Sequence, residues 1–227
     1  MRTLNYVISL ITSIAFVFTG CGKSDKEVKV GETQKVNTTK EGKSLAVDLN
    51  SSRVEWTGKK VTGKHTGTIN ISRGEVIIDK DNITGGSIEI DMKTIVNTDL
   101  SDKEYNNKLI NHLKSDDFFS VEKFPVSKFE ITAVSPYSDA QKPGYNMIIK
   151  GNLTIKGVSK GISFPANIKI DNGMVTVNAD FDIDRTEFNL KYGSGKFFEN
   201  LGDKMIYDDF NIKFNITARQ NNENNNS

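Results

Sequence analysis

Apolar and polar residues alternate with a period of two over most of the chain between Leu45 and Arg219. The clearest runs are 162–170, 175–183 and 210–218, in which every second residue is apolar and the residues between are mostly polar. Such alternation turns one apolar face of a strand inward and one polar face to water. Burial on a single face is typical of antiparallel sheets, so we expect antiparallel strands rather than a parallel α/β fold.

Turn residues separate these runs. Asn172-Gly173 joins two of them, and this pair predicts a tight hairpin because both residues tolerate positive φ. Lys80-Asp81-Asn82 and Lys156-Gly157 mark two further breaks. With the additional strands that the pattern predicts, the count is eight or nine; these additional strands are Arg53–Thr62, Thr66–Arg73 and Val126–Val134.

One segment departs from the alternation and predicts a helix. Ser101 and Glu104 have the Ser-x-x-Glu spacing of a capping box, which is typical of a helix start. Four residues then recur at helical spacing and share one face of the helix: Tyr105, Leu109, His112 and Leu113. We therefore expect one helix from about Asp102 to Lys114.

Long antiparallel strands joined by hairpins fit either a sandwich or a closed barrel. An up-and-down barrel is favoured because closure leaves no exposed strand edge. The fold class that we predict is mainly β, an antiparallel eight-stranded barrel with one helix. At eight strands, the interior either is filled by side chains or holds one small ligand, and alternation alone does not distinguish the two.

The first 20 residues have the features of a bacterial secretion signal. Arg2 precedes a mostly apolar run, Leu4–Phe18, which is shorter than the roughly 20 residues that span a bilayer. The sequence Phe18-Thr19-Gly20-Cys21 resembles a lipobox, although Phe18 replaces the usual Leu, and Cys21 is the only cysteine. We expect residues 1–20 to be a lipoprotein signal peptide and Cys21 to be acylated. A plain secreted protein with a free cysteine and an uncleaved anchor are the alternatives.

The segments that flank the alternating region are polar. Most of residues 21–44 are Lys, Glu, Thr and other polar residues, with no aromatic, so we expect a flexible tether there. Residues 220–227 are mostly Asn, and we expect a disordered tail. A single folded domain, residues 45–219, remains between them.

Composition and motifs narrow the classes of function. Lys plus Arg is 30 and Asp plus Glu is 29, which gives no basic excess for a nucleic-acid partner. One Cys and two His exclude an intrachain disulfide, a Cys-based zinc site and a three-His site. No Gly-x-Ser-x-Gly or His-Glu-x-x-His occurs, and Gly193-Ser194-Gly195-Lys196 lacks the first Gly and the Ser/Thr of a phosphate loop. We expect neither an enzyme nor a metalloprotein.

Five segments of the domain carry more specific motifs: VEWTGKKVTGKHTGTI (Val54–Ile69), IEIDMKTIVNTDL (Ile88–Leu100), LINHLKSDDFFSVEKFP (Leu109–Pro125), GNLTIKGVSKGISFPA (Gly151–Ala166) and FDIDRTEFNLKYG (Phe181–Gly193). Together, and in this order, they resemble the YceI-like family of bacterial lipid-binding proteins. The resemblance implies a lipocalin-like barrel with an elongated apolar cavity for a polyisoprenoid or a related amphiphile, such as a quinone or a fatty amide. It defines no catalytic residues, and an acylated cysteine is not a family feature.

A long apolar ligand requires a continuous apolar lining. Burying about 500 Å² of ligand at about 25 cal/mol per Å² gives roughly 12 kcal/mol before entropy costs, so apolar contacts alone could support tight binding. The inward strand residues that we expect at the ligand are Trp56, Ile69, Ile88, Ile90, Phe129, Ile131, Met147, Phe164, Phe181 and Phe214. Around the helix at a barrel mouth we add Leu109, His112, Leu113 and Phe118. The alternative is that the same residues fill a solid core.

Three polar residues are candidates for the ligand site, and each has two interpretations. His112 either meets the polar head of a ligand or bonds a loop carbonyl, and His65 fits a turn or a cross-strand partner better than a site. Arg185 either binds a phosphate or quinone oxygen or fixes a strand end by pairing with a nearby carboxylate (Asp91, Asp182 or Asp184).

The sequence thus predicts an envelope lipoprotein that binds a polyisoprenoid, an isoprenoid quinone or a fatty-acid derivative for storage or transport. Its lipid anchor would hold it at the periplasmic face or the cell surface, and no cofactor other than the bound lipid is expected. The rivals are a structural or protein-interaction lipoprotein with a filled barrel, and an enzyme that acts on a lipid head through His112 or Arg185. Whether two barrels pair into a homodimer is left open by the sequence.

Overall fold

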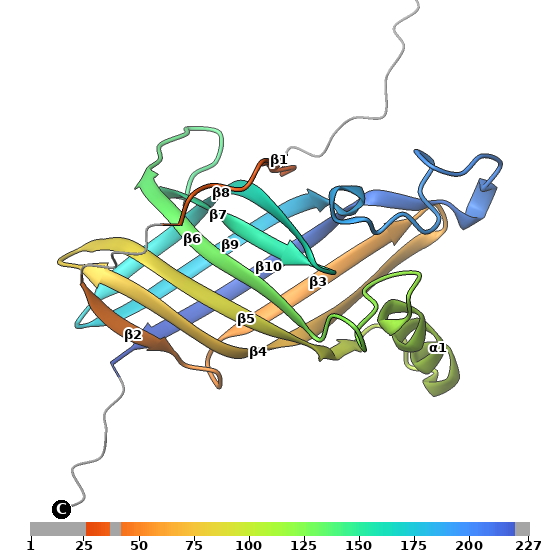
Figure 1. Ribbon diagram of the computed structural model, residues 1–227, viewed down its shortest axis with the longest axis horizontal. Helices are drawn as coiled ribbons and strands as arrows, with labels where there is room; N and C mark the ends of the chain where they lie inside the picture. The colour runs from red at the N-terminus through yellow and green to blue at the C-terminus, as the bar shows by residue number, and fades with distance from the viewer. Residues whose placement is uncertain (1–25, 37–41, 221–227) are drawn as a thin grey trace, which may run out of the picture.

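The computed structural model describes residues 26–36 and 42–220, and its main feature is a closed antiparallel barrel (Figure 1). Each barrel strand pairs with the next along the chain, and the last pairs with the first through Phe214↔Val54 and its neighbours. The predicted eight-stranded barrel is confirmed. Its strands are β3 (Arg53–Lys60), β4 (Gly63–Asp79), β5 (Asn82–Asn97), β6 (Val126–Pro136), β7 (Met147–Ile155), β8 (Val158–Asp171), β9 (Met174–Asp184) and β10 (Ile206–Arg219).

The turn residues of the sequence predict where several strands end. Asn172 and Gly173 have positive φ values of 49° and 77° and close the β8–β9 hairpin, as their pairing predicts. The expected strand Thr66–Arg73 is only part of β4, which is 17 residues long in all and extends through the following apolar run. A short strand, β2 (Lys43–Val47), precedes β3 and pairs with β4 and β10.

Two long connections leave the barrel at the same end, which we call the α1 end. One joins β5 to β6 and contains α1 (Lys103–Lys114). The other joins β9 to β10 and contains two short 3-10 helices, η1 (Arg185–Phe188) and η2 (Gly202–Lys204). Figure 1 shows both on the right, so this end carries most of the irregular structure that could surround an opening.

Helix α1 is in the expected place, but it is held differently from our prediction. Asp102, not Ser101, is the N-cap, and its Oδ1 accepts from the backbone N–H groups of Glu104 and Tyr105. No helix residue is buried, and Tyr105, which we expected on the inner face, is 64% exposed. Of the expected inner face, Leu113 packs against the core, and polar contacts also attach the helix to β5, such as the 2.7 Å bond from the Lys114 Nζ to the Lys93 carbonyl.

The N-terminal segment corrects the expectation of a flexible tether. The residues that form β1, Lys29–Gly31, pair antiparallel with β8, and the Val28 N–H donates to the Asp182 carbonyl of β9 over 2.9 Å. Strands β8 and β9 pair with each other only between the β8–β9 turn and Asn167↔Asn178, so this segment occupies the rest of the gap. Val28 is buried in the core and Val30 packs against it, but these two alternate valines form too short a run to predict a strand.

We call residues 26–34 the strap, because beyond β1 this segment crosses the outside of β7. The Asn152 side chain of β7 fixes it by two hydrogen bonds with the backbone of Gln34, at 2.8 and 2.7 Å. A Cβ atom at Gly161 of β8 would lie 2.3 Å from the Glu32 carbonyl oxygen. The bare backbone at Gly161 therefore allows the strap to lie against the barrel wall.

Several sequence predictions fall outside the described residues. They are the signal peptide (1–20), Cys21, residues 22–25 and 37–41 of the expected tether, and 221–227 of the expected tail. Within 26–36 and 42–220, no helix is both long enough and apolar enough to cross a membrane.

Substitution Gly161→Ala tests whether the strap depends on this close approach. The added methyl group collides with the Glu32 carbonyl, so the strap should detach and amide exchange at Val28 should accelerate by about tenfold or more, because a lost hydrogen bond and lost apolar burial together exceed about 1.4 kcal/mol. Hydrogen–deuterium exchange measures this. Gly31→Ala is the matched control, since nothing lies within 4 Å of a Cβ there. Unchanged protection of Val28 in the Gly161→Ala variant would contradict the strap's dependence on Gly161.

Candidate functional site

The barrel encloses a cavity of about 210 Å³. Well-packed protein interiors contain few voids larger than a water molecule, and an apolar cavity of about 150 Å³ is already large enough to take up benzene. The interior is therefore hollow over part of its length. This finding contradicts the alternative in which side chains fill the barrel.

The alternation of apolar and polar residues along the strands determines which side chains line the cavity. Phe210, Ile212, Phe214 and Ile216 are alternate residues of β10, and all four face the cavity. Every barrel strand contributes at least one lining residue. Ile88, Ile90 and Ile212 point inward yet are only half-buried, because their side chains border open space rather than other atoms.

Most of the side chains that the sequence proposed for the ligand border this cavity. They are Trp56, Ile69, Ile88, Ile90, Leu113, Phe118, Phe129, Ile131, Phe164, Phe181, Arg185 and Phe214. The structure places Leu109, His112 and Met147 outside the lining. Met147 packs against the core beside Ala166, at the opposite end of the barrel from α1, and the His112 ring packs against the rings of Phe118 and Tyr192 without reaching the cavity.

Sequence reasoning missed several lining residues on the strands, most of which follow the same alternation, while Val76 and Ile95 are out of phase with the earlier lining residues of β4 and β5. The missed residues are Val54, Val76, Ile95, Ile149, Leu153, Ile155, Ile162, Val177, Ile183, Phe210, Ile212 and Ile216. The pattern that selected Phe214 would also have selected Ile212 and Phe210, so the signal was present. Phe119 and Leu190 lie in connections, and no periodicity marks them.

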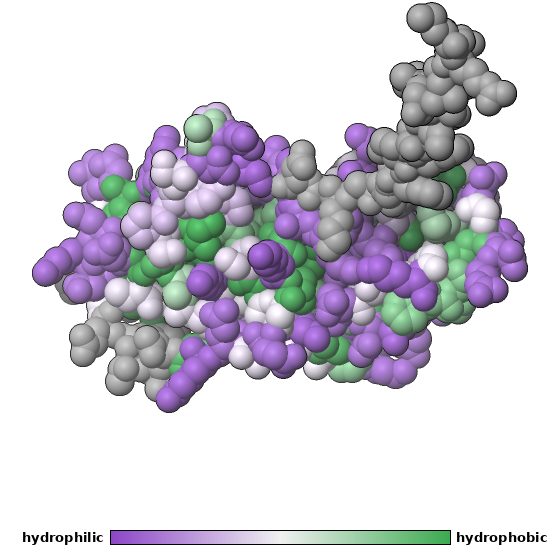
Figure 2. Space-filling model, turned by 90° about the horizontal axis from the view of Figure 1, so that it is seen from above, coloured by the Kyte–Doolittle hydropathy of each residue, from purple (hydrophilic) through white to green (hydrophobic). Residues whose placement is uncertain are grey.

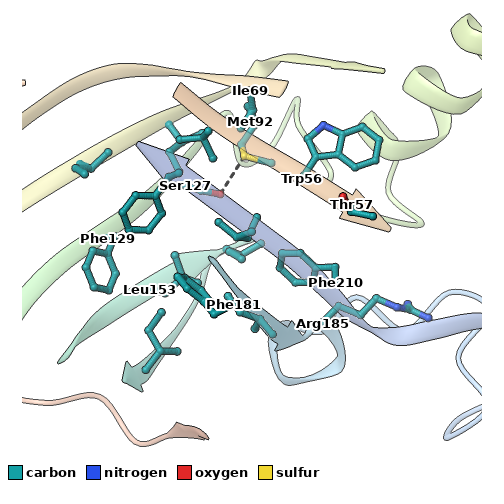
Figure 3. A pocket seen from close by; sticks show the side chains of 18 of the residues that line it. Trp56, Thr57, Ile69, Met92, Ser127, Phe129, Leu153, Phe181, Arg185 and Phe210 are labelled. Atoms are coloured by element: carbon teal, nitrogen blue, oxygen red, sulfur yellow. Dashed lines mark hydrogen bonds between the residues drawn. The ribbon is translucent and has the colours of Figure 1, made fainter. Parts of the chain in front are cut away.

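Four phenylalanine rings meet inside the barrel and form the most densely packed part of the lining. Phe164 of β8 stacks on Phe181 of β9 with ring centroids 4.2 Å apart. Phe129 and Phe214 approach Phe164 from β6 and β10, at 5.6 and 5.9 Å. These contacts join strands β6, β8, β9 and β10, and all four rings line the cavity (Figure 3 labels Phe129 and Phe181).

Two polar side chains of the lining, Ser127 and Trp56, are hydrogen-bonded to the protein, and Thr57 and Asp209 line the cavity at its α1 end. The Ser127 hydroxyl donates to the Met92 sulfur over 3.1 Å (Figure 3). The Trp56 Nε1–H donates to the Val96 carbonyl over 3.2 Å. The cavity therefore offers almost only apolar surface, which favours an apolar molecule through burial and provides little directed contact.

Arg185 borders the cavity, but its guanidinium is directed away from it (Figure 3). The group is 4% exposed and donates to four backbone carbonyls at 2.5–3.0 Å, those of Leu190, Tyr192, Ile206 and Tyr207. Its nearest carboxylate is Asp208, at 3.4 Å, rather than any of the three partners that we considered. Burial lowers the pKa of Arg185, and Asp208 and Asp184 oppose this effect. These bonds fix the β9–β10 connection to the barrel.

Neither histidine reaches the cavity. The His112 ring lies edge-on to Phe118 and Tyr192, with centroids 5.0 and 4.6 Å away, and its Nε2 is 3.4 Å from the Asp117 carboxylate. The His65 Nδ1 is 2.9 Å from the Asp99 carboxylate, which follows β5, so His65 acts as a cross-strand partner. Among the residues described, no group of three or more His, Cys, Asp or Glu is placed to hold a metal ion.

Two curated relatives resemble part of the chain. A UPF0312 protein of Shewanella denitrificans is 31% identical over 101 residues, which are 44% of this chain and 48% of the relative. A UPF0312 protein of Photorhabdus laumondii is 29% identical over 102 residues, or 45% and 47% of the two chains. The match thus spans about half the length of these curated relatives.

Two solved structures resemble the fold over more of the chain. Burkholderia cenocepacia BcnA has a TM-score of 0.58 and 25% identity, and the match covers 76% of this chain and 99% of BcnA. A polyisoprenoid-binding domain from Saccharophagus degradans, implicated in plant cell wall breakdown, has a TM-score of 0.57 and 14% identity, with 78% and 98% covered. The model of the YceI-like domain matches residues 45–218, which include the whole barrel except Arg219. The chain therefore belongs to the YceI-like family.

Proposed function

We propose that the protein binds a long-chain lipid in the barrel cavity and stores or carries it without changing it chemically. The observation that carries this proposal is a 210 Å³ cavity with an almost wholly apolar lining. The fold shared with a domain described as polyisoprenoid-binding supports a polyisoprenoid as one ligand class. An isoprenoid quinone and a fatty-acid derivative have the same apolar chain and fit the same lining.

The polar end of such a ligand belongs at the α1 end. Inside the cavity, Ser127 and Trp56 use their hydrogen-bond donors within the protein, and the donors of Arg185 are all directed to backbone carbonyls. A head group buried there would lose its bonds to water without replacement, at a cost of about 1–3 kcal/mol for each polar group. The lining extends to Tyr207, whose side chain is exposed, so a head group at this end stays in water.

Attachment to the envelope rests on the N-terminal sequence. Arg2, the short apolar run Leu4–Phe18 and Cys21 form a lipoprotein signal, and acyl chains on Cys21 would hold the barrel at a membrane through about 0.8 kcal/mol for each buried methylene. The proposed location is the periplasmic face or the cell surface. A membrane-held carrier has access to lipids that are almost insoluble in water.

Cavity-filling substitutions test ligand binding directly. The double variant I90F/I212F adds two rings to side chains that border open space, so the affinity for an apolar fluorescent dye should fall by about tenfold or more, which is a loss of about 1.4 kcal/mol. Dye titration and native mass spectrometry of copurified lipid measure the effect. Val126→Phe, on an exposed β6 position, is the matched control and should bind normally. Saturable binding that is equal in all three proteins would contradict a cavity site.

The Arg185→Met variant separates a structural role from a ligand role. It leaves four backbone carbonyls without their donor and leaves Lys196 as the remaining cation beside Asp208, so the free energy of unfolding should fall by about 3 kcal/mol or more. Dye affinity per folded molecule should stay unchanged, because no donor of Arg185 faces the cavity. Denaturant unfolding and dye titration measure the two quantities. A large loss of affinity with little loss of stability would show that Arg185 binds the ligand.

Acylation of Cys21 is tested by metabolic labelling with an alkyne fatty acid. The natural chain should incorporate the label and lose residues 1–20, whereas Cys21→Ala should do neither, because the thiol is the acylation site. Intact-protein mass spectrometry gives both results. A labelled Cys21→Ala chain, or an unlabelled natural chain, would refute the lipoprotein assignment.

A further inference from the structure

The α1 end of the barrel carries large apolar side chains that are exposed rather than packed in the core. Val61, at the tip of the β3–β4 hairpin, and Phe197, Phe198 and Tyr207, in or next to the β9–β10 connection, are between 41 and 48% exposed. Figure 2 shows apolar side chains, in green, at this end of the molecule. The two segments are in contact, since the Val61 N–H donates to the Met205 carbonyl over 3.2 Å. We call the exposed surface of residues 57–64 and 191–207 the mouth patch.

Lysines surround these apolar groups. The hairpin contributes Lys59, Lys60 and Lys64 with no carboxylate, and the connection contributes three more lysines against Glu199 and Asp203. In the described part of the chain, none of the three hairpin lysines forms an ion pair with a carboxylate. Lys196 of the connection pairs with Asp184 and Asp208, so the unpaired positive charge of this surface is concentrated on the three lysines of the hairpin.

The mouth patch borders the cavity. Thr57 and Gly58 of β3 and Ile206 and Tyr207 of β10 belong to both the patch and the lining. A molecule that leaves the cavity at this end passes directly over the exposed aromatic side chains. Aromatic rings flanked by lysines are the composition that lies favourably at the boundary between lipid head groups and acyl chains.

The described chain begins beside β9. Lys26 is hydrogen-bonded to Asp180, and Val28 to Asp182, near the end of β9 from which the connection with the patch begins. Cys21 is five residues before Lys26, a length that reaches at most about 18 Å. An acylated Cys21 would therefore keep the whole barrel next to a bilayer, and the anchor by itself favours neither end.

We propose that the mouth patch docks on an anionic phospholipid bilayer, with Val61, Phe197, Phe198 and Tyr207 in the head-group region and the lysines on the lipid phosphates. This inference deepens the proposed lipid-carrier function, because it names the surface from which the ligand enters the cavity. Docking lets an acyl or isoprenoid chain pass from the bilayer into the barrel without crossing water.

Depth-dependent fluorescence on the full chain tests the docked orientation. An environment-sensitive dye is attached to Thr62→Cys, at the hairpin tip in the patch, and in a matched variant to Asp81→Cys, at the β4–β5 hairpin tip on the opposite end. Both proteins are reconstituted with vesicles of phosphatidylglycerol that carry spin-labelled lipids, and the unmodified chain reports any label on Cys21. We expect strong quenching at residue 62 and little at residue 81. Equal quenching at the two tips would overturn the proposal, because a tether alone would then explain the proximity.

Variants of the patch test its two components. The triple variant K59Q/K60Q/K64Q should lower the ratio of docked to undocked protein on phosphatidylglycerol by roughly 100-fold, the factor that about 1 kcal/mol for each lysine gives. F197S/F198S should also reduce quenching at residue 62, whereas L49S/M174S, which removes two exposed apolar side chains from the opposite end, should not. Quenching as strong on phosphatidylcholine as on phosphatidylglycerol, or unchanged in K59Q/K60Q/K64Q, would overturn the role of the lysines.

Two further measurements separate this inference from its rivals. A shift of the dye at residue 62 that depends on protein concentration without vesicles would show that a second copy covers the patch, which overturns docking on lipid. Native mass spectrometry of the same variants reports copurified lipid independently. Lipid in the cavity of a protein that does not dock would overturn this inference alone, and an empty cavity in a protein that docks would overturn the carrier function alone.

Discussion

The hydrogen bonds between β10 and β3 are the constraint on which the rest of the structure depends. They close the sheet on itself, so every barrel strand has a partner on both sides and the wall is held by backbone bonds around its circumference. An open sheet has to bury its apolar face against another layer to be stable. A closed barrel buries this face against itself, and its centre can then stay partly empty. The cavity thus follows from closure together with inward side chains that do not meet everywhere across the axis.

The two ends of the barrel are organised differently, and Arg185 is central to this difference. Its donors hold the carbonyls of the β9–β10 connection against the end of β9, which keeps Tyr192 and Tyr207 at the α1 end. Asp184 supports the same region. Burial would raise the pKa of Asp184, but hydrogen bonds from Lys196 and Thr186 outweigh this effect and lower it. A single buried cation therefore positions both the edge of the cavity and the exposed aromatic surface next to it.

Strand positions could be predicted from the sequence because burial on one face leaves a period of two that is visible in residues such as Phe210, Ile212 and Phe214. The hollow itself could not, since an inward isoleucine looks the same in sequence whether it meets another side chain or open space. The resemblance to a family supplied that expectation. Leu109 and His112 were misplaced because helical periodicity gives a shared face but not what the face contacts, and α1 is attached by polar bonds at its end.

The segments that connect the barrel strands were the part of the structure that could least be predicted from the sequence. Nothing in the spacing of Arg185 indicated that its partners would be four main-chain carbonyls within 22 residues, because such bonds depend on the path of the backbone and not on side-chain identity. The strap was missed for a related reason. Its two valines form too short a run to predict a strand, and its place is determined by the gap that β8 and β9 leave between them.

The strap also determines how the barrel bears mechanical load. A force applied to the chain before Lys26 acts first on residues 26–31, because these residues are part of the barrel wall between β8 and β9. Tension would first break the hydrogen bonds of this segment to β8 and β9, and only then act on the closed barrel. Residues 26–31 would thus detach before the barrel unfolds.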